Sequence, residues 1–61
     1  MYIIEYKDLF QTTYLASKFD MFSPIPSLAL KFKTNQEAVD VLHSLMLFEK
    51  YPMRFSVIAE I

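Results

Sequence analysis

The chain has 61 residues, 54% of them hydrophobic, and a formal net charge of −1 from six basic and seven acidic side chains. It contains no glycine, no cysteine and no tryptophan, and one histidine, His43. These counts exclude glycine-rich phosphate loops, disulfides and cysteine-based zinc sites, because each needs a residue type that is missing. The near-neutral charge argues against a nucleic acid or an acidic membrane surface as partner.

A single small domain is expected over residues 1–61. A chain of this length buries only about 60% of the surface that it exposes when unfolded, so its stability needs a dense apolar core or association. No apolar run approaches the roughly 20 residues of a membrane span. The opening sequence MYIIEYK lacks the basic region and cleavage site of a signal peptide, so the expected compartment is the cytoplasm.

Residues 1–7 and 11–17 predict the two strands of a β-hairpin. The expected core face of the first strand is the one without charges, which carries Tyr2, Ile4 and Tyr6. Asp8 is the best candidate for the turn, because aspartate tolerates left-handed backbone and its side chain bonds nearby backbone N–H groups.

Residues 18–27 predict an irregular stretch, since Pro24 and Pro26 prevent a central strand. Residues 28–33 then alternate apolar and polar side chains, which predicts a third strand. Its expected core-facing residues are Leu28, Leu30 and Phe32, with Ala29, Lys31 and Lys33 facing outward.

A capping box predicts the start of a helix at Asn35. In this arrangement the Thr34 side chain accepts a hydrogen bond from the Glu37 N–H, and the Glu37 side chain reaches back to Thr34. The helix is expected over residues 35–50, because Pro52 disfavours a helical residue before it.

Two apolar residues do not fit the expected pattern. At about 100° per residue, the helix has an apolar half and a polar half, and Leu47 falls within the polar half beside Asp40 and His43. Residues 53–61 alternate again and predict a last strand, with Met53, Phe55, Val57, Ala59 and Ile61 facing inward. Ile58 is the apolar exception on the outward face of this strand.

The element order β-β-β-α-β predicts an α+β fold with a four-stranded, largely antiparallel sheet in the order 3-2-1-4 and the helix packed on one face. A right-handed crossover is expected to bring the last strand beside the first and parallel to it. One helix covers one sheet face only. The other face must therefore meet water, the residues of the 18–27 stretch or a partner.

Asp40 and His43 are the one pair that could act as acid and base, because residues three apart share a helix face. A solvated helix face is the simpler interpretation, since no nucleophile accompanies the pair and an exposed helix is not a water-excluded pocket. One histidine with scattered carboxylates is also too weak a signal for a metal site. We therefore predict no enzyme, no cofactor and no metal.

Three basic residues, Lys31, Lys33 and Arg54, suggest an outer sheet face that could meet RNA. The aromatic residues Phe32 and Phe55 are expected on the opposite face, where bases could not stack between them and the charges. Solubility and protection of an edge strand explain the basic residues more simply, so nucleic-acid binding is not expected.

The leading hypothesis is a protein–protein interaction module whose contact residues are Leu47, His43, Asp40 and Ile58. Compact chains of this length with a hairpin, an F-x-T-x-x-E-A helix start and a terminal strand look like small phage or mobile-element proteins; here residues 32–38 carry that pattern. It covers only a helix start, so no family is assigned, but the likeness implies a chain that binds and modulates a host protein. The alternatives are a homodimer or other homo-oligomer formed through the open sheet face or an edge strand, and an RNA-binding module.

Overall fold

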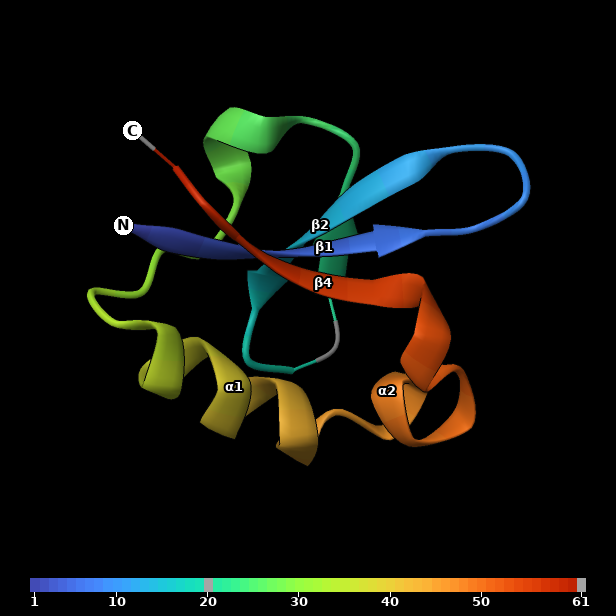
Figure 1. Ribbon diagram of the computed structural model, residues 1–61. Helices are drawn as coiled ribbons and strands as arrows, with labels where there is room; N and C mark the ends of the chain where they lie inside the picture. Colours follow the sequence, from blue (N-terminus) through green and yellow to red (C-terminus); the bar gives the residue numbers. More distant parts are fainter. Residues whose placement is uncertain (20, 61) are drawn as a thin grey trace.

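A computed structural model describes residues 1–19 and 21–60 of the chain. These residues form one sheet in the order β3-β2-β1-β4, which confirms the predicted α+β architecture. The strands are β1 (Tyr2–Lys7), β2 (Thr12–Ser17), β3 (Met21–Ser23) and β4 (Phe55–Ala59). The helices are α1 (Asn35–Ser44) and α2 (Met46–Lys50), with 3-10 turns η1 (Pro26–Leu28) and η2 (Pro52–Arg54). Figure 1 shows α1 and α2 on one side of the sheet and η1 on the other.

The turn between β1 and β2 closes around Asp8, as predicted. Asp8 Oδ1 accepts hydrogen bonds from the N–H groups of Phe10 at 2.7 Å and Gln11 at 2.8 Å. The Asp8 N–H in turn donates to the Gln11 carbonyl at 3.1 Å. The two bonds to its carboxylate lower the pKa of Asp8 below its ordinary value of 3.8. A side chain thus closes a hairpin that lacks the usual glycine.

The third strand lies earlier in the chain than expected. β3 occupies residues predicted to be irregular, and it pairs antiparallel with β2, with Leu15 opposite Phe22. The prolines that were expected to exclude a strand follow β3 rather than interrupt it. Residues 28–33, the predicted strand, contribute only an isolated bridge between Phe32 and Tyr2.

Residues 30–32 connect β1 and β2 beyond the hairpin ladder. Phe32 and Tyr2 exchange two backbone hydrogen bonds of 2.8 Å, and the Leu30 N–H donates to the Leu15 carbonyl, also at 2.8 Å. This additional pass of the chain reverses its direction before α1 begins. β4 therefore returns antiparallel to β1, and the expected parallel pairing is wrong.

The helix start was predicted correctly. α1 begins at Asn35, and Thr34 Oγ1 accepts a hydrogen bond from the Glu37 N–H at 3.1 Å. The Glu37 carboxylate reaches one residue further back than expected, because its Oε2 accepts from the Lys33 N–H at 3.3 Å. Both ends of the capping interaction are therefore occupied.

The predicted continuous helix is broken at Leu45, which has extended backbone angles of φ −79° and ψ 131°. Just before the break, Ser44 Oγ donates to the Val41 carbonyl at 2.6 Å, a side-chain bond to the last turn of the helix. The break changes the helical phase, so Leu47 and Phe48 pack against the core from α2. Leu47 is out of pattern only for a helix that continues through Leu45.

The main core lies between the sheet and the helices. Its largest fully buried side chains are Ile4 and Leu15 at 0% exposure and Leu45 at 2%. The expected core face of β1 is confirmed, because Tyr2 and Tyr6 pack against this cluster on either side of Ile4. Truncating such a buried leucine or isoleucine to alanine costs about 2–5 kcal/mol.

The opposite sheet face is also partly covered. Ile3 is 3% exposed and Ala29 is 7% exposed, although Ala29 was expected to face outward. η1, which begins within the 18–27 stretch, packs against β2 on this side. Leu28, which was expected to face inward, is 57% exposed.

The start of the last strand was placed too early. Met53 lies in η2 rather than in β4 and is 97% exposed, whereas Phe55, the first residue of β4, is buried. Ala59, also expected to face inward, is exposed. Ile61, the last residue of the predicted strand, lies outside the described residues.

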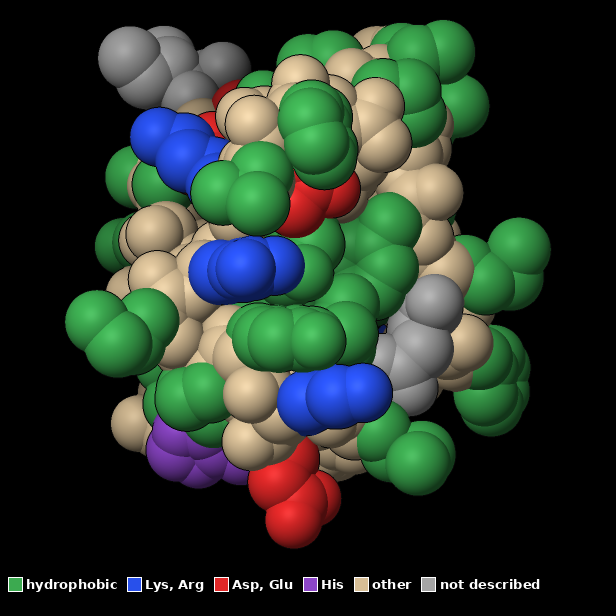
Figure 2. Space-filling view, turned by 90° about the vertical axis from the view of Figure 1, so that its right-hand side faces the viewer, with side chains coloured by type: hydrophobic (Ala, Val, Ile, Leu, Met, Phe, Trp, Pro, Cys, Tyr) green, Lys and Arg blue, Asp and Glu red, His purple; other side chains and the backbone are tan. Residues whose placement is uncertain are grey.

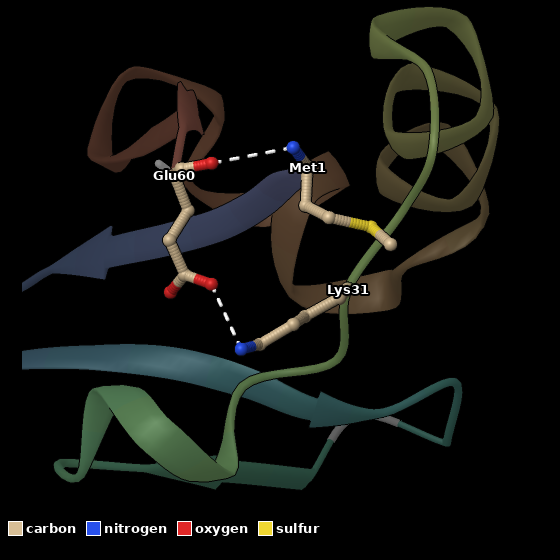
Figure 3. A network of polar contacts seen from close by, with 3 residues as sticks. All are labelled: Met1, Lys31 and Glu60. Carbon is tan, nitrogen blue, oxygen red and sulfur yellow. Dashed lines mark hydrogen bonds and ion pairs between the residues drawn. The ribbon is translucent and has the colours of Figure 1, made fainter.

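Polar contacts join the two ends of the chain (Figure 3). The Met1 ammonium donates to the Glu60 carbonyl at 3.2 Å, and the Glu60 N–H donates to the Met1 carbonyl at 2.7 Å. The Glu60 carboxylate also pairs with Lys31 Nζ at 2.9 Å.

Among the helices that the structure describes, none has the length and apolar character to cross a membrane.

Candidate protein-binding groove

An apolar groove of about 420 Å³ lies between α2 and β3. Its lining residues are Phe22 from β3 and Met46, Leu47 and Lys50 from α2. Phe22 and Leu47 are half-buried, whereas Met46 is 78% exposed. Figure 2 shows the side of the molecule that carries α2, where apolar side chains gather beside basic ones.

A cluster of aromatic rings holds the β3 wall of the groove in place. The Phe22 ring lies 5.7 Å from Tyr6 and 6.0 Å from Phe55, measured between ring centroids. Phe55 also contacts Phe48 of α2 in an edge-on arrangement, with centroids 5.7 Å apart. Because the same cluster fixes β3 and α2, the groove is pre-formed, as is usual for binding sites.

One positive charge borders the groove. The ion pairs found among residues 1–19 and 21–60 join Lys7 to Glu5 and Lys31 to Glu60, and neither involves Lys50. Lys50 Nζ instead lies 5.6 Å from the centre of the Tyr51 ring. The groove thus offers an apolar surface with a cation at its rim, which complements an apolar side chain beside a carboxylate.

Of the four predicted contact residues, Leu47 is the one that lines the groove. It also packs against the core, so it supports the fold as well as the surface. The exposed apolar residue of the groove, Met46, was missed, because a continuous helix places it in the buried half. The sequence contained one signal for Met46. Leu47, an apolar residue in the polar half of the expected helix, indicated that the helical phase changes at this point.

Asp40 and His43 are both exposed, in agreement with a solvated helix face, and each contacts a different neighbour. Asp40 Oδ1 accepts a hydrogen bond from Gln36 Nε2 at 2.8 Å. His43 stacks on Phe48 instead, with ring centroids 5.4 Å apart. Asp40 borders a different hollow, of about 430 Å³, which Lys18, Lys31 and Glu37 also line.

Ile58 lies apart from the groove. It is half-buried in β4, directly opposite Ile3 of β1, and it lies on the sheet face away from the main core, because its neighbour Val57 packs against that core. Ile58 therefore contributes to the packing of that second face and does not share a surface with Leu47.

Two of the three basic residues lie at opposite ends of β4. Lys31 pairs with Glu60 near the end of β4, whereas Arg54 precedes the start of β4. The Arg54 guanidinium carbon lies 4.6 Å from the centre of the Tyr51 ring. This separation does not favour the arrangement expected for a sheet that binds RNA.

Other exposed apolar side chains lie outside the groove. Leu9 and Phe10, at the tip of the β1–β2 hairpin, are 81% and 94% exposed, and Met53 of η2 is 97% exposed. Neither of the two hollows described above includes these side chains. They provide a natural comparison for the groove, because they are exposed and apolar but line neither hollow.

No family model matches this chain, and no curated protein and no solved structure is found to be similar to it. Within the described residues, no three His, Asp or Glu side chains cluster in a way that could hold a metal ion.

Proposed function

We propose that this chain is a protein–protein interaction module that binds its partner through the groove between α2 and β3. The observation that carries the proposal is the exposure of Met46, at 78%, above the half-buried walls formed by Phe22 and Leu47. Proteins bury the central side chains of a partner in concave apolar surfaces whose walls are held in place by the core.

The chemistry of the groove suggests what the partner presents. Burying one large apolar side chain stabilises a complex by about 1.5–3 kcal/mol, and the flexible Met46 side chain can adapt to its shape. Lys50 at the rim favours a carboxylate next to that side chain. In line with the likeness of the helix start to small phage proteins, we propose a host protein as this partner.

The test is affinity capture from cells of the native host with a matched pair of variants. Met46→Glu places a charge in the groove, and Met53→Glu places the same charge on a methionine of similar exposure outside it. The proposal predicts a partner that Met53→Glu retains and Met46→Glu loses. Loss with Met53→Glu alone would instead assign binding to the surface around η2.

A further inference from the structure

β3 forms one edge of the sheet, next to β2. Leu15 of β2 lies opposite Phe22 of β3. The Leu15 carbonyl accepts a hydrogen bond from the Leu30 N–H, in the segment that also bridges to β1, so it points away from β3. In an antiparallel ladder, the two residues of such a pair direct their backbone groups away from each other. The Phe22 N–H and C=O groups therefore point to the open edge, where no described residue pairs with them.

The hairpin gives the same alternation independently. The Gln11 carbonyl accepts a hydrogen bond from the Asp8 N–H, so the backbone groups of Gln11 face β1. Because the direction changes at each residue of a strand, Tyr14, three positions further on, faces β3 and lies opposite Ser23. Ser23 thus bonds β3 to β2, and Phe22 is the residue of β3 that offers its backbone to a further strand.

The groove lies beside this outward-facing backbone. The Phe22 side chain packs against the main core and lines the groove together with Leu47 of α2. In antiparallel strands, directly opposed residues carry their side chains on the same face of the sheet. A strand that bonds to the Phe22 backbone therefore directs the side chain of its opposing residue into the groove.

We propose that the partner binds as an extended segment, which pairs antiparallel with β3 and places one large apolar side chain in the groove. This inference rests on the proposed function, because it concerns the same groove. Antiparallel pairing fits a strand of 3 residues, since both hydrogen bonds of Phe22 then go to one opposing residue. Where a peptide adds a strand to a sheet, backbone bonds provide affinity and pockets select the side chains.

Lys50 specifies a second feature of the segment. Its side chain lines the groove together with Met46, on the α2 side of the sheet. Side chains two residues apart along a strand share a face. A carboxylate two residues from the apolar side chain therefore lies on the same side of the sheet as Lys50, where the opposite charges attract. The chain thus selects an apolar residue with an acidic residue two positions away.

A synthetic heptapeptide with blocked ends, Thr-Asp-Thr-Leu-Thr-Asp-Thr, is the probe for this proposal. Such a short segment buries little surface, so we expect a dissociation constant on the order of 1 mM. In an NMR titration the probe should shift the amide signals of β3 and α2. Met46→Glu should abolish these shifts, and Met53→Glu should retain them. A probe that does not bind, or that binds Met46→Glu equally well, would overturn the proposal.

N-methylation of the probe tests the backbone pairing. A methyl group on the leucine nitrogen removes the donor to the Phe22 carbonyl and should weaken binding by at least about tenfold. A methyl group on the next threonine nitrogen is the matched control and should preserve the affinity, because that N–H points away from β3. Replacing both aspartates by lysine should also weaken binding, because it reverses the charges that face Lys50. Equal affinities of the two N-methylated peptides would refute pairing with β3.

A synthetic chain with N-methylphenylalanine at position 22 separates this inference from the proposed function. The N–H that it lacks points outward, so its circular dichroism should match that of the wild type, whereas its binding of the probe should weaken. A host protein that this chain captures and Met46→Glu loses would support the groove and overturn the strand pairing. Binding of the probe in the expected manner, without any host protein that depends on Met46, would overturn the proposed function alone.

Discussion

The imidazole of His43 stacks on the ring of Phe48 across the break between α1 and α2, with 5.4 Å between ring centroids and 26° between ring planes. Phe48 in turn contacts Phe55 in the sheet, with an interplanar angle of 73°. An exposed residue of α1 is thus connected through α2 to the buried cluster. This contact holds α2 in the orientation that forms one wall of the groove.

We therefore expect His43→Ala to lower the free energy of unfolding by about 0.5–1.5 kcal/mol, the value of an aromatic pair. Phe48→Ala should cost more, about 2–4 kcal/mol, because it also removes core contacts. His43→Phe preserves the stacked ring and should keep most of the stability. Urea denaturation measures all three, and a His43→Ala chain as stable as the wild type would show that the stack does not support α2.

The cap of α1 gives a second expectation. Thr34→Ala removes the acceptor for the Glu37 N–H and should reduce the free energy of unfolding by about 1 kcal/mol, whereas Thr34→Ser should keep it. Thermal or urea denaturation compares the two variants. Equal stability of the alanine and serine variants would mean that the hydroxyl is not needed at this helix end.

The hairpin turn predicts a dependence on pH. Backbone hydrogen bonds from Phe10 and Gln11 lower the pKa of Asp8 below 3.8 in the folded chain. The stability that this carboxylate contributes is present above its ordinary pKa and is lost as the pH falls through the folded-state value. Asp8→Asn keeps a hydrogen-bond acceptor without the charge. The free energy of unfolding of this variant should therefore fall less than that of the wild type as the pH is lowered. Denaturation curves at several pH values measure this difference. Parallel profiles of unfolding free energy against pH for the wild type and Asp8→Asn would contradict the expectation.

Local signals in the sequence were sufficient for the elements whose ends depend on one side chain. Thr34 marks the start of α1 and Asp8 marks the hairpin turn, because each hydroxyl or carboxylate bonds backbone groups two or three residues away. The strand order could also be predicted, since a helix between strands must pack across the sheet.

The direction of β4 could not be predicted, because it depends on the number of chain passes before the helix. β3 has only 3 residues, too few to show an alternating pattern, and the alternation of residues 28–33 belongs to a segment that makes one bridge to Tyr2. The sequence therefore predicted one pass of the chain where the structure has two, β3 and residues 28–33. As a result, the expected direction of β4 was wrong. The groove was missed for a related reason, since it exists only because Leu45 breaks the helix.

The different roles of Leu47 and Met46 lead to a fourth expectation. Leu47→Glu should lower the free energy of unfolding by about 2 kcal/mol or more, because it places a charge against the core. Met46→Glu, at a mostly exposed position, should change it by less than about 0.5 kcal/mol. Chemical denaturation separates the two, and a large loss with Met46→Glu would show that Met46 is part of the core instead.

The most direct measurement of partner binding through the groove is site-specific photocrosslinking in the native host. A photoreactive amino acid is placed at position 46 in one chain and at position 53 in another, two methionine sites that are 78% and 97% exposed. Position 46 should give a discrete crosslinked species with one host protein, and Lys50→Glu should reduce its yield, because the rim charge is reversed. Position 53 should not give that species. A crosslink of equal yield from both positions, or from position 53 alone, would contradict binding through the groove.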